Sequence, residues 1–246
     1  MIDTKLEVPT RDGNAEAFLY RPDESGVWPG VICLTDIAGI RPAYHRMVRR
    51  LSEQGFAVLL PNIFHRVSKL PVFDFEAKMG DERTMKRLGE LRAGLNAEQA
   101  LADGGSYTDF LLAQKGVKPG RAGVVGYCFT GSMAVRTASA RPERIAAAAS
   151  FHGGGIATDQ PDSPHLLLPK IKARLYFGHA VEDRSMPAAA IEKLDVALKA
   201  WGGRCKSETY AGAYHGWTVP GSPVYNETQA ERHFEKLVAL FRETLN

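Results

Sequence analysis

The chain has 246 residues, 44% of them hydrophobic, which is enough to bury the core of one large α/β domain. Its formal net charge at pH 7 is only +3, and basic and acidic residues are interspersed, which argues against a protein that binds nucleic acid or a membrane surface. The N-terminal sequence has no apolar core of the signal-peptide type, and no apolar run approaches the roughly 18 residues that a membrane helix needs.

Along the chain, apolar runs alternate with segments of helical spacing. We expect strands at residues 4–8, 15–20, 29–35, 56–60, 122–125, 145–151, 173–177 and 206–210, the first two as an antiparallel edge. We expect helices at residues 42–54, 81–92, 95–115, 187–200 and 227–244, and one more after Cys128. The long irregular stretch 62–80 is typical of a lid or pocket wall. Because alternating strands and helices favour a mainly parallel sheet with helices on both faces, we predict one α/β domain over residues 1–246.

The segment RAGVVGYCFTGSMAVRTA at 121–138 has the pattern of a nucleophile elbow. An apolar strand breaks at Gly126, Cys128 follows, and helical spacing resumes after Gly131. In such an elbow a tight turn exposes the nucleophile, and the N-terminus of the next helix favours a thiolate. Thr130 stands where the usual pattern has its second glycine. The alternative is a structural cysteine, since unpaired cysteines are often buried.

A thiol nucleophile needs a histidine base and an acid that orients the base. Asp183 and His215 each lie in the loop after a predicted strand, and the order of nucleophile, acid and histidine is that of α/β-hydrolases. Since these loops open at one edge of a parallel sheet, we expect the three side chains to form a catalytic triad. Glu182 is an alternative acid, and Asp183 as a helix cap or His215 as a structural histidine are further alternatives. We interpret His152 as structural or exposed.

Three motifs carry a resemblance that covers nearly the whole chain. They are GYC at 126–128, GHAVEDRSMP at 178–187 and AGAYHGW at 211–217. With them the chain resembles the dienelactone hydrolase family, which has the α/β-hydrolase fold. The resemblance implies lactone or ester substrates and no cofactor.

The resemblance also implies roles for individual residues. It implies Cys128 as nucleophile, His215 as base and Asp183 as the orienting acid. It further implies an oxyanion hole formed by two backbone N–H groups, those of Ile37 and Phe129.

The sequence departs from the family pattern around the expected site. Asp36 stands where the family typically has a glutamate that interacts with the cysteine. We take Asp36 as a candidate catalytic residue whose side chain, shorter by one methylene, either keeps this interaction or loses it. The family holds a substrate carboxylate with two arginines, of which Arg83 matches one, and none follows shortly after His215. We expect Arg83, Tyr127 and Trp217 to contact the substrate. Trp217 and Tyr214 indicate a more apolar or aromatic pocket.

The sequence therefore predicts a cysteine-dependent hydrolase of a small ester or lactone that works through an acyl-enzyme. A thioesterase or acyltransferase with the same triad, or a non-catalytic binding protein of this fold, are the alternatives. Cys33, Cys128 and Cys205 lie far apart without CxxC spacing, and no histidine pair has zinc-ligand spacing, so we expect no disulfide framework and no metal. We expect a cytoplasmic monomer or homodimer with a small-molecule substrate and neither nucleic-acid nor membrane partners.

Overall fold

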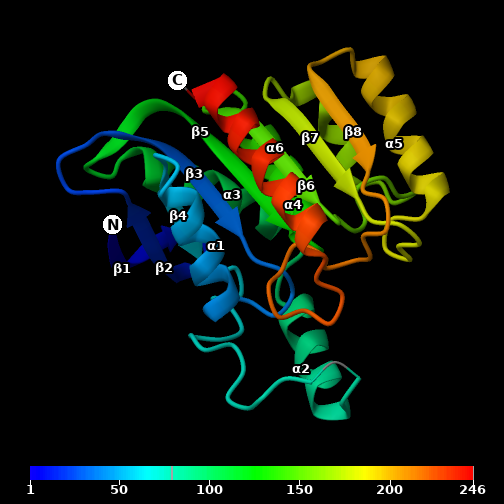
Figure 1. Ribbon diagram of the computed structural model, residues 1–246, viewed down its shortest axis with the longest axis horizontal. Coiled ribbons are helices and arrows are strands. Elements are labelled where there is room, and N and C mark those ends of the chain that lie inside the picture. The colour runs from blue at the N-terminus through cyan, green and yellow to red at the C-terminus, as the bar shows by residue number, and fades with distance from the viewer. Residues whose placement is uncertain (79, 246) are drawn as a thin grey trace.

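The alternating apolar runs form a twisted sheet in the computed structural model, which describes residues 1–78 and 80–245 (Figure 1). Its strands are β1 (Ile2–Thr10), β2 (Gly13–Arg21), β3 (Trp28–Leu34), β4 (Ala57–Pro61), β5 (Val117–Tyr127), β6 (Ile145–Phe151), β7 (Arg174–His179) and β8 (Cys205–Thr209). They lie in the order β1-β2-β4-β3-β5-β6-β7-β8. Strand β2 pairs antiparallel with β1 and β4, and the strands from β4 to β8 pair in parallel.

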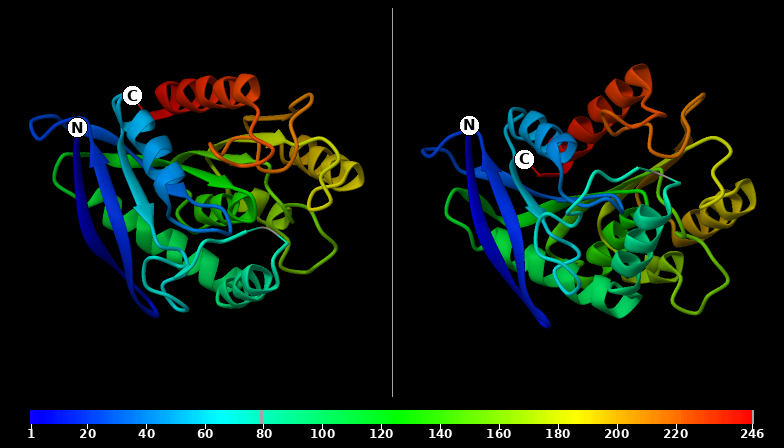
Figure 2. Two further views of the ribbon diagram at one scale, coloured as in Figure 1. Left: turned by 60° about the horizontal axis from the view of Figure 1, so that its bottom comes forward. Right: turned by 90° about the horizontal axis from the view of Figure 1, so that it is seen from below.

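Helices cover both faces of this sheet (Figure 2). They are α1 (Pro42–Ser52), α2 (Glu82–Ala93), α3 (Ala97–Leu112), α4 (Thr130–Ala140), α5 (Ala188–Trp201) and α6 (Glu227–Leu245), with a 3-10 helix η1 at Pro164–Lys170. Helices α1 and α6 pack on one face, and α3 and α4 pack on the other. The prediction of a mainly parallel sheet with helices on both faces is confirmed.

Strand β3 shows why this sequence gives a central strand. Successive side chains of a strand point to opposite faces, so Val31 and Cys33 enter the core under α1 and α6, whereas Ile32 and Leu34 enter the core under α3 and α4. All four side chains are buried. A continuous apolar run is therefore required here, because neither face of the strand meets water.

Strand β5 begins earlier than the apolar run predicts. Its first residue, Val117, pairs with Trp28, and the register shifts before Gly30 pairs with Ala122. Residues 118–121 are exposed and continue the strand beyond the core. Hydrophobicity alone marks only the buried part of such a strand, which is why the prediction started at residue 122.

The carboxyl ends of the parallel strands open towards helix α2 and the irregular segment before it (Figure 1). Residues 62–78 contain neither helix nor strand, as predicted, and residue 79 of the predicted irregular stretch lies outside the described residues. Phe64 and Val72 anchor this segment in the core. In the part of the chain that the structure describes, no helix has the length and apolar character needed to cross a bilayer.

Candidate active site

Cys128 lies in a tight turn between β5 and α4, with a positive φ of 59°. Small residues make room for this turn: a Cβ at Gly126 would lie 2.1 Å from the carbonyl oxygen of Thr130, and one at Gly131 would lie 2.3 Å from Ser150 Oγ. The turn therefore needs both glycines and presents the thiol at the carboxyl end of the sheet.

Thr130 can stand at the position of the usual second glycine because its hydroxyl forms hydrogen bonds with the end of strand β5. The side chain is fully buried. Its Oγ1 accepts a hydrogen bond from Tyr127 N at 2.9 Å and donates one to Tyr127 O at 2.8 Å. The threonine thus fastens the first turn of α4 to the end of β5.

His152 is buried behind Cys128 and binds its backbone amide. Cys128 N donates to His152 Nδ1 at 3.0 Å, so the ring proton is on Nε2, which lies 2.8 Å from Thr218 Oγ1. Burial, with His215 nearby, lowers the pKa of His152 well below its ordinary value. This neutral histidine was interpreted from sequence as structural or exposed; it is structural, and its partner is the amide of Cys128.

His215 pairs with Asp183, as the chain order predicts. His215 Nδ1 lies 2.6 Å from Asp183 Oδ2, and Ser185 Oγ donates to Asp183 Oδ1 at 2.7 Å. Burial alone would lower the pKa of His215, but Asp183 and the neighbouring Cys128 raise it to about 10. Although burial opposes the shift, hydrogen bonds from His215 and Ser185 lower the pKa of Asp183. Glu182, the alternative acid, is exposed and has no hydrogen bond to His215.

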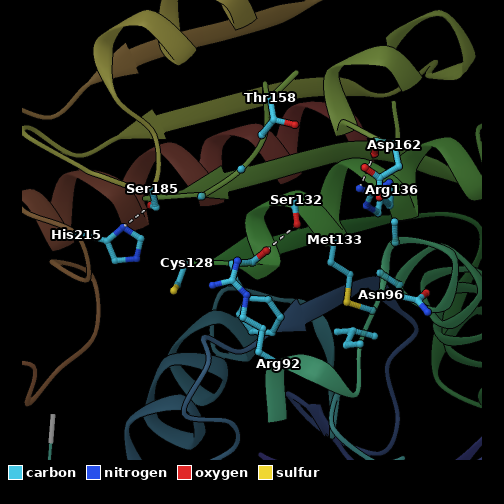
Figure 3. Close-up of a pocket in the computed structure, with 16 residues that line it drawn as sticks. Arg92, Asn96, Cys128, Ser132, Met133, Arg136, Thr158, Asp162, Ser185 and His215 are labelled. Atoms are coloured by element: carbon cyan, nitrogen blue, oxygen red, sulfur yellow. Dashed lines mark hydrogen bonds between the residues drawn. The ribbon is translucent and has the colours of Figure 1, made fainter. Parts of the chain in front are cut away.

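Cys128 and His215 face a common cavity of about 540 Å³ (Figure 3). The backbone N–H groups of Ile37 and Phe129 donate to no other group within the described residues. Both amides are therefore available to an oxyanion, as an oxyanion hole requires. Across residues 1–78 and 80–245, no three His, Cys, Asp or Glu side chains are grouped so that they could hold a metal ion.

Asp36 pairs with Arg41, and the expected contact with Cys128 is absent from the hydrogen bonds of the described residues. Arg41 Nη1 and Nη2 each lie 2.6 Å from one oxygen of the carboxylate, and Ala38 N donates to Asp36 Oδ1 at 2.9 Å. The shorter aspartate side chain ends within its own loop, where these donors occupy it. This replaces the expected role of Asp36 at the thiol with an ion pair.

Three side chains expected to touch the substrate lie elsewhere. Arg83 stacks on Phe75, 3.9 Å from the ring centroid, in a separate groove. Tyr127 points to the face covered by α6, because side chains alternate along β5. Trp217 is fully buried, with its ring centroid 5.0 Å from that of His152. The expected contacts are therefore corrected: none of the three lines the cavity at Cys128.

The cavity has two arginines that the sequence analysis did not select. Arg92 comes from the last turn of α2 and Arg136 from α4, and both are labelled in Figure 3. Arg92 is the last residue of the helix expected at 81–92, and nothing in the sequence distinguishes it from the other charged residues of that helix. The usable signal for Arg136 is its spacing: it follows Ser132 by one helical turn in the helix that Cys128 precedes.

This sheet order, with the tight turn of Cys128 between the central strand β5 and α4, is that of an α/β-hydrolase fold. The dienelactone hydrolase family matches residues 15–245, and the chain belongs to that family. The family is one of hydrolases.

Individual relatives agree with this assignment. A Synechocystis sp. protein provisionally named carboxymethylenebutenolidase is 27% identical, over 98% of this chain and 97% of its own length. A carboxymethylenebutenolidase of Rhodococcus opacus is 25% identical over 93% of this chain and 86% of its own. A solved structure from Klebsiella pneumoniae subsp. pneumoniae, provisionally named dienelactone hydrolase, has a TM-score of 0.85 at 22% identity and covers 98% of both chains.

Proposed function

We propose that the protein hydrolyses small esters or lactones through a covalent acyl-enzyme on Cys128. The observation that carries the proposal is the pairing of His215 with Asp183 at 2.6 Å on a cavity that Cys128 also lines. The family and the names of its relatives support a carboxylic ester as the substrate class.

In the first half of the reaction, Cys128 attacks the carbonyl carbon as a thiolate, paired with the imidazolium of His215. With a pKa of about 10, His215 holds its proton at neutral pH and places a positive charge beside the nucleophile. The backbone N–H groups of Ile37 and Phe129 bind the oxyanion of the tetrahedral intermediate. His215 Nε2 then gives its proton to the leaving oxygen as the C–O bond breaks, which releases the alcohol and leaves a thioester on Cys128.

In the second half, water replaces the alcohol. His215, now neutral, takes a proton from the water molecule, whose oxygen attacks the thioester carbonyl. Collapse of the second tetrahedral intermediate breaks the C–S bond and releases the carboxylic acid, and the thiolate–imidazolium pair is restored. Asp183 keeps Nδ1 engaged throughout, so that Nε2 is the atom that moves the proton.

The test is hydrolysis of a small p-nitrophenyl ester over roughly pH 5 to 10, by wild type and Cys128→Ala. We expect loss of activity by about a thousandfold or more in Cys128→Ala. Cys205→Ala is the matched control, since Cys205 is exposed on β8. Acid quenching followed by mass spectrometry of peptides should find the acyl group on Cys128, and undiminished turnover by Cys128→Ala would refute the proposal.

A further inference from the structure

One face of α4 forms a wall of the catalytic cavity and leads away from the nucleophile. Phe129, Ser132, Met133 and Arg136 all line the cavity, and their spacing of three or four residues puts them on one face. At a rise of about 1.5 Å per residue, Arg136 stands about 9 Å beyond Thr130, where α4 begins. Figure 3 shows Ser132 between Cys128 and Arg136. The cavity therefore has a reacting end and a remote end.

Arg136 brings a charge without an ion-pair partner to the remote end. It is half-buried, and Nη2 donates to the backbone oxygen of Asp162 at 2.7 Å. Within residues 1–78 and 80–245, no carboxylate forms a salt bridge with it. Burial lowers the pKa of its guanidinium, which is the effect of removing a cation from water. A guanidinium has five N–H donors, and the bond to Asp162 O occupies one of those of Arg136 among the described residues.

The geometry at Cys128 decides which part of a substrate reaches Arg136. The leaving oxygen must lie beside His215, which protonates it. His215 and Arg136 lie on opposite sides of Cys128 in the cavity (Figure 3). The acyl chain therefore extends away from His215, along α4 towards Arg136. The cavity lining also has apolar side chains that an acyl chain can contact, those of Leu95, Met133 and Ala100.

We infer that Arg136 is a specificity residue that binds a carboxylate at the far end of the acyl chain. The preferred substrates are then monoesters of dicarboxylic acids, with an apolar chain between the ester and the free carboxylate. The orientation of the acyl chain rests on the proposed function, whereas the binding of the carboxylate by Arg136 does not.

A substitution that removes the charge of Asp162 should act in the opposite direction to one that removes the charge of Arg136. The carboxylate of Asp162 belongs to the same end of the cavity, although it forms no salt bridge with Arg136 among the described residues. A bound carboxylate is repelled by Asp162 and attracted by Arg136. Removing either charge should thus change the affinity for a charged acyl chain in opposite directions.

The kinetic test compares p-nitrophenyl monoesters of succinic, adipic, suberic and sebacic acids with their methyl-capped diesters. The quantity measured is the ratio of kcat/KM for the charged to that for the capped substrate. We expect Arg136→Gln to lower this ratio by about tenfold to hundredfold, since hydrogen bonds to charged groups are strong. Asp162→Asn should raise it, and Arg136→Lys should restore part of it. Arg83→Gln, which removes a cation outside the cavity, should leave it unchanged.

A binding test separates this inference from the proposed chemistry. Monoethyl suberate is titrated calorimetrically into Cys128→Ala, with and without the additional Arg136→Gln substitution. We expect Kd to rise by about tenfold to hundredfold in the double variant. An unchanged Kd, or a loss that follows Arg92→Gln instead, would overturn the assignment to Arg136. If wild type hydrolyses none of the aryl esters but Kd depends on Arg136, the proposed function fails and the anion subsite stands.

Discussion

The raised pKa of His215 links the charge of the candidate site to the stability of the fold. His215 titrates with a pKa of about 10 in the folded protein and near its ordinary value of 6.5 when unfolded. Because the folded form binds the proton more tightly, protonation contributes its full stability below about pH 6.5, and this contribution is lost as the pH rises towards 10. We therefore expect the stability advantage of wild type over His215→Gln to shrink across this range.

Urea denaturation of both proteins at intervals over the same pH range measures this difference directly. Comparison with the variant removes the contribution of other titrating groups, which the two proteins share. Two stability profiles that run parallel from pH 6.5 to 10 would show that the pKa of His215 is not raised in the fold.

At the level of elements, a substitution of Thr130 tests which contacts hold the turn at Cys128. Thr130→Val keeps the shape of the side chain but leaves Tyr127 N and Tyr127 O without their hydroxyl partner. We expect a loss of about 1–3 kcal/mol in the free energy of unfolding, because these groups are buried. Thr137→Val is the control in the same helix, where the hydroxyl donates to Met133 O one turn before. Equal losses in the two variants would contradict a special role for Thr130 in the turn.

The same element shows what a sequence can predict and where it stops. The strand before Cys128, the turn and the helix after it follow from local patterns, namely an apolar run, two glycines and helical spacing. The side to which Tyr127 points depends on the register of β5 in the sheet, which no local pattern gives. Asp36 was expected at the thiol, but its loop brings Arg41 to it, and that contact depends on the path of the backbone.

Over the whole molecule, too, some contacts between distant segments can be predicted from the sequence and others cannot. The order of Cys128, Asp183 and His215 along the chain was enough to predict that their loops meet, since parallel strands end at one edge of the sheet. The second wall of the cavity comes from α2 and α3, which follow an irregular segment. No rule fixes where such a segment returns, so the contribution of Arg92 was not predictable.

A buried ion pair joins the irregular segment 62–78 to helix α3. Removing it tests how much this contact contributes to the stability of the fold. Asp103 of α3 has a side chain that is 0% exposed, and both its oxygens accept from Arg66, at 2.6 and 2.7 Å. Asp103→Asn leaves the Arg66 guanidinium with only the partly exposed carboxylate of Asp12, 2.8 Å away, so we expect a loss of about 3 kcal/mol in the free energy of unfolding.

The control for this variant is a pair at the surface. Asp109 of the same helix lies 2.7 Å from Arg141, but both side chains are 40% exposed or more, so Asp109→Asn should cost only about 0–1 kcal/mol. Denaturation in urea measures both losses. The double change Asp103→Leu with Arg66→Met should recover much of the stability, since it removes both charges together. Similar losses in the buried and exposed variants would mean that the segment is held by packing of Phe64 and Val72 rather than by the ion pair.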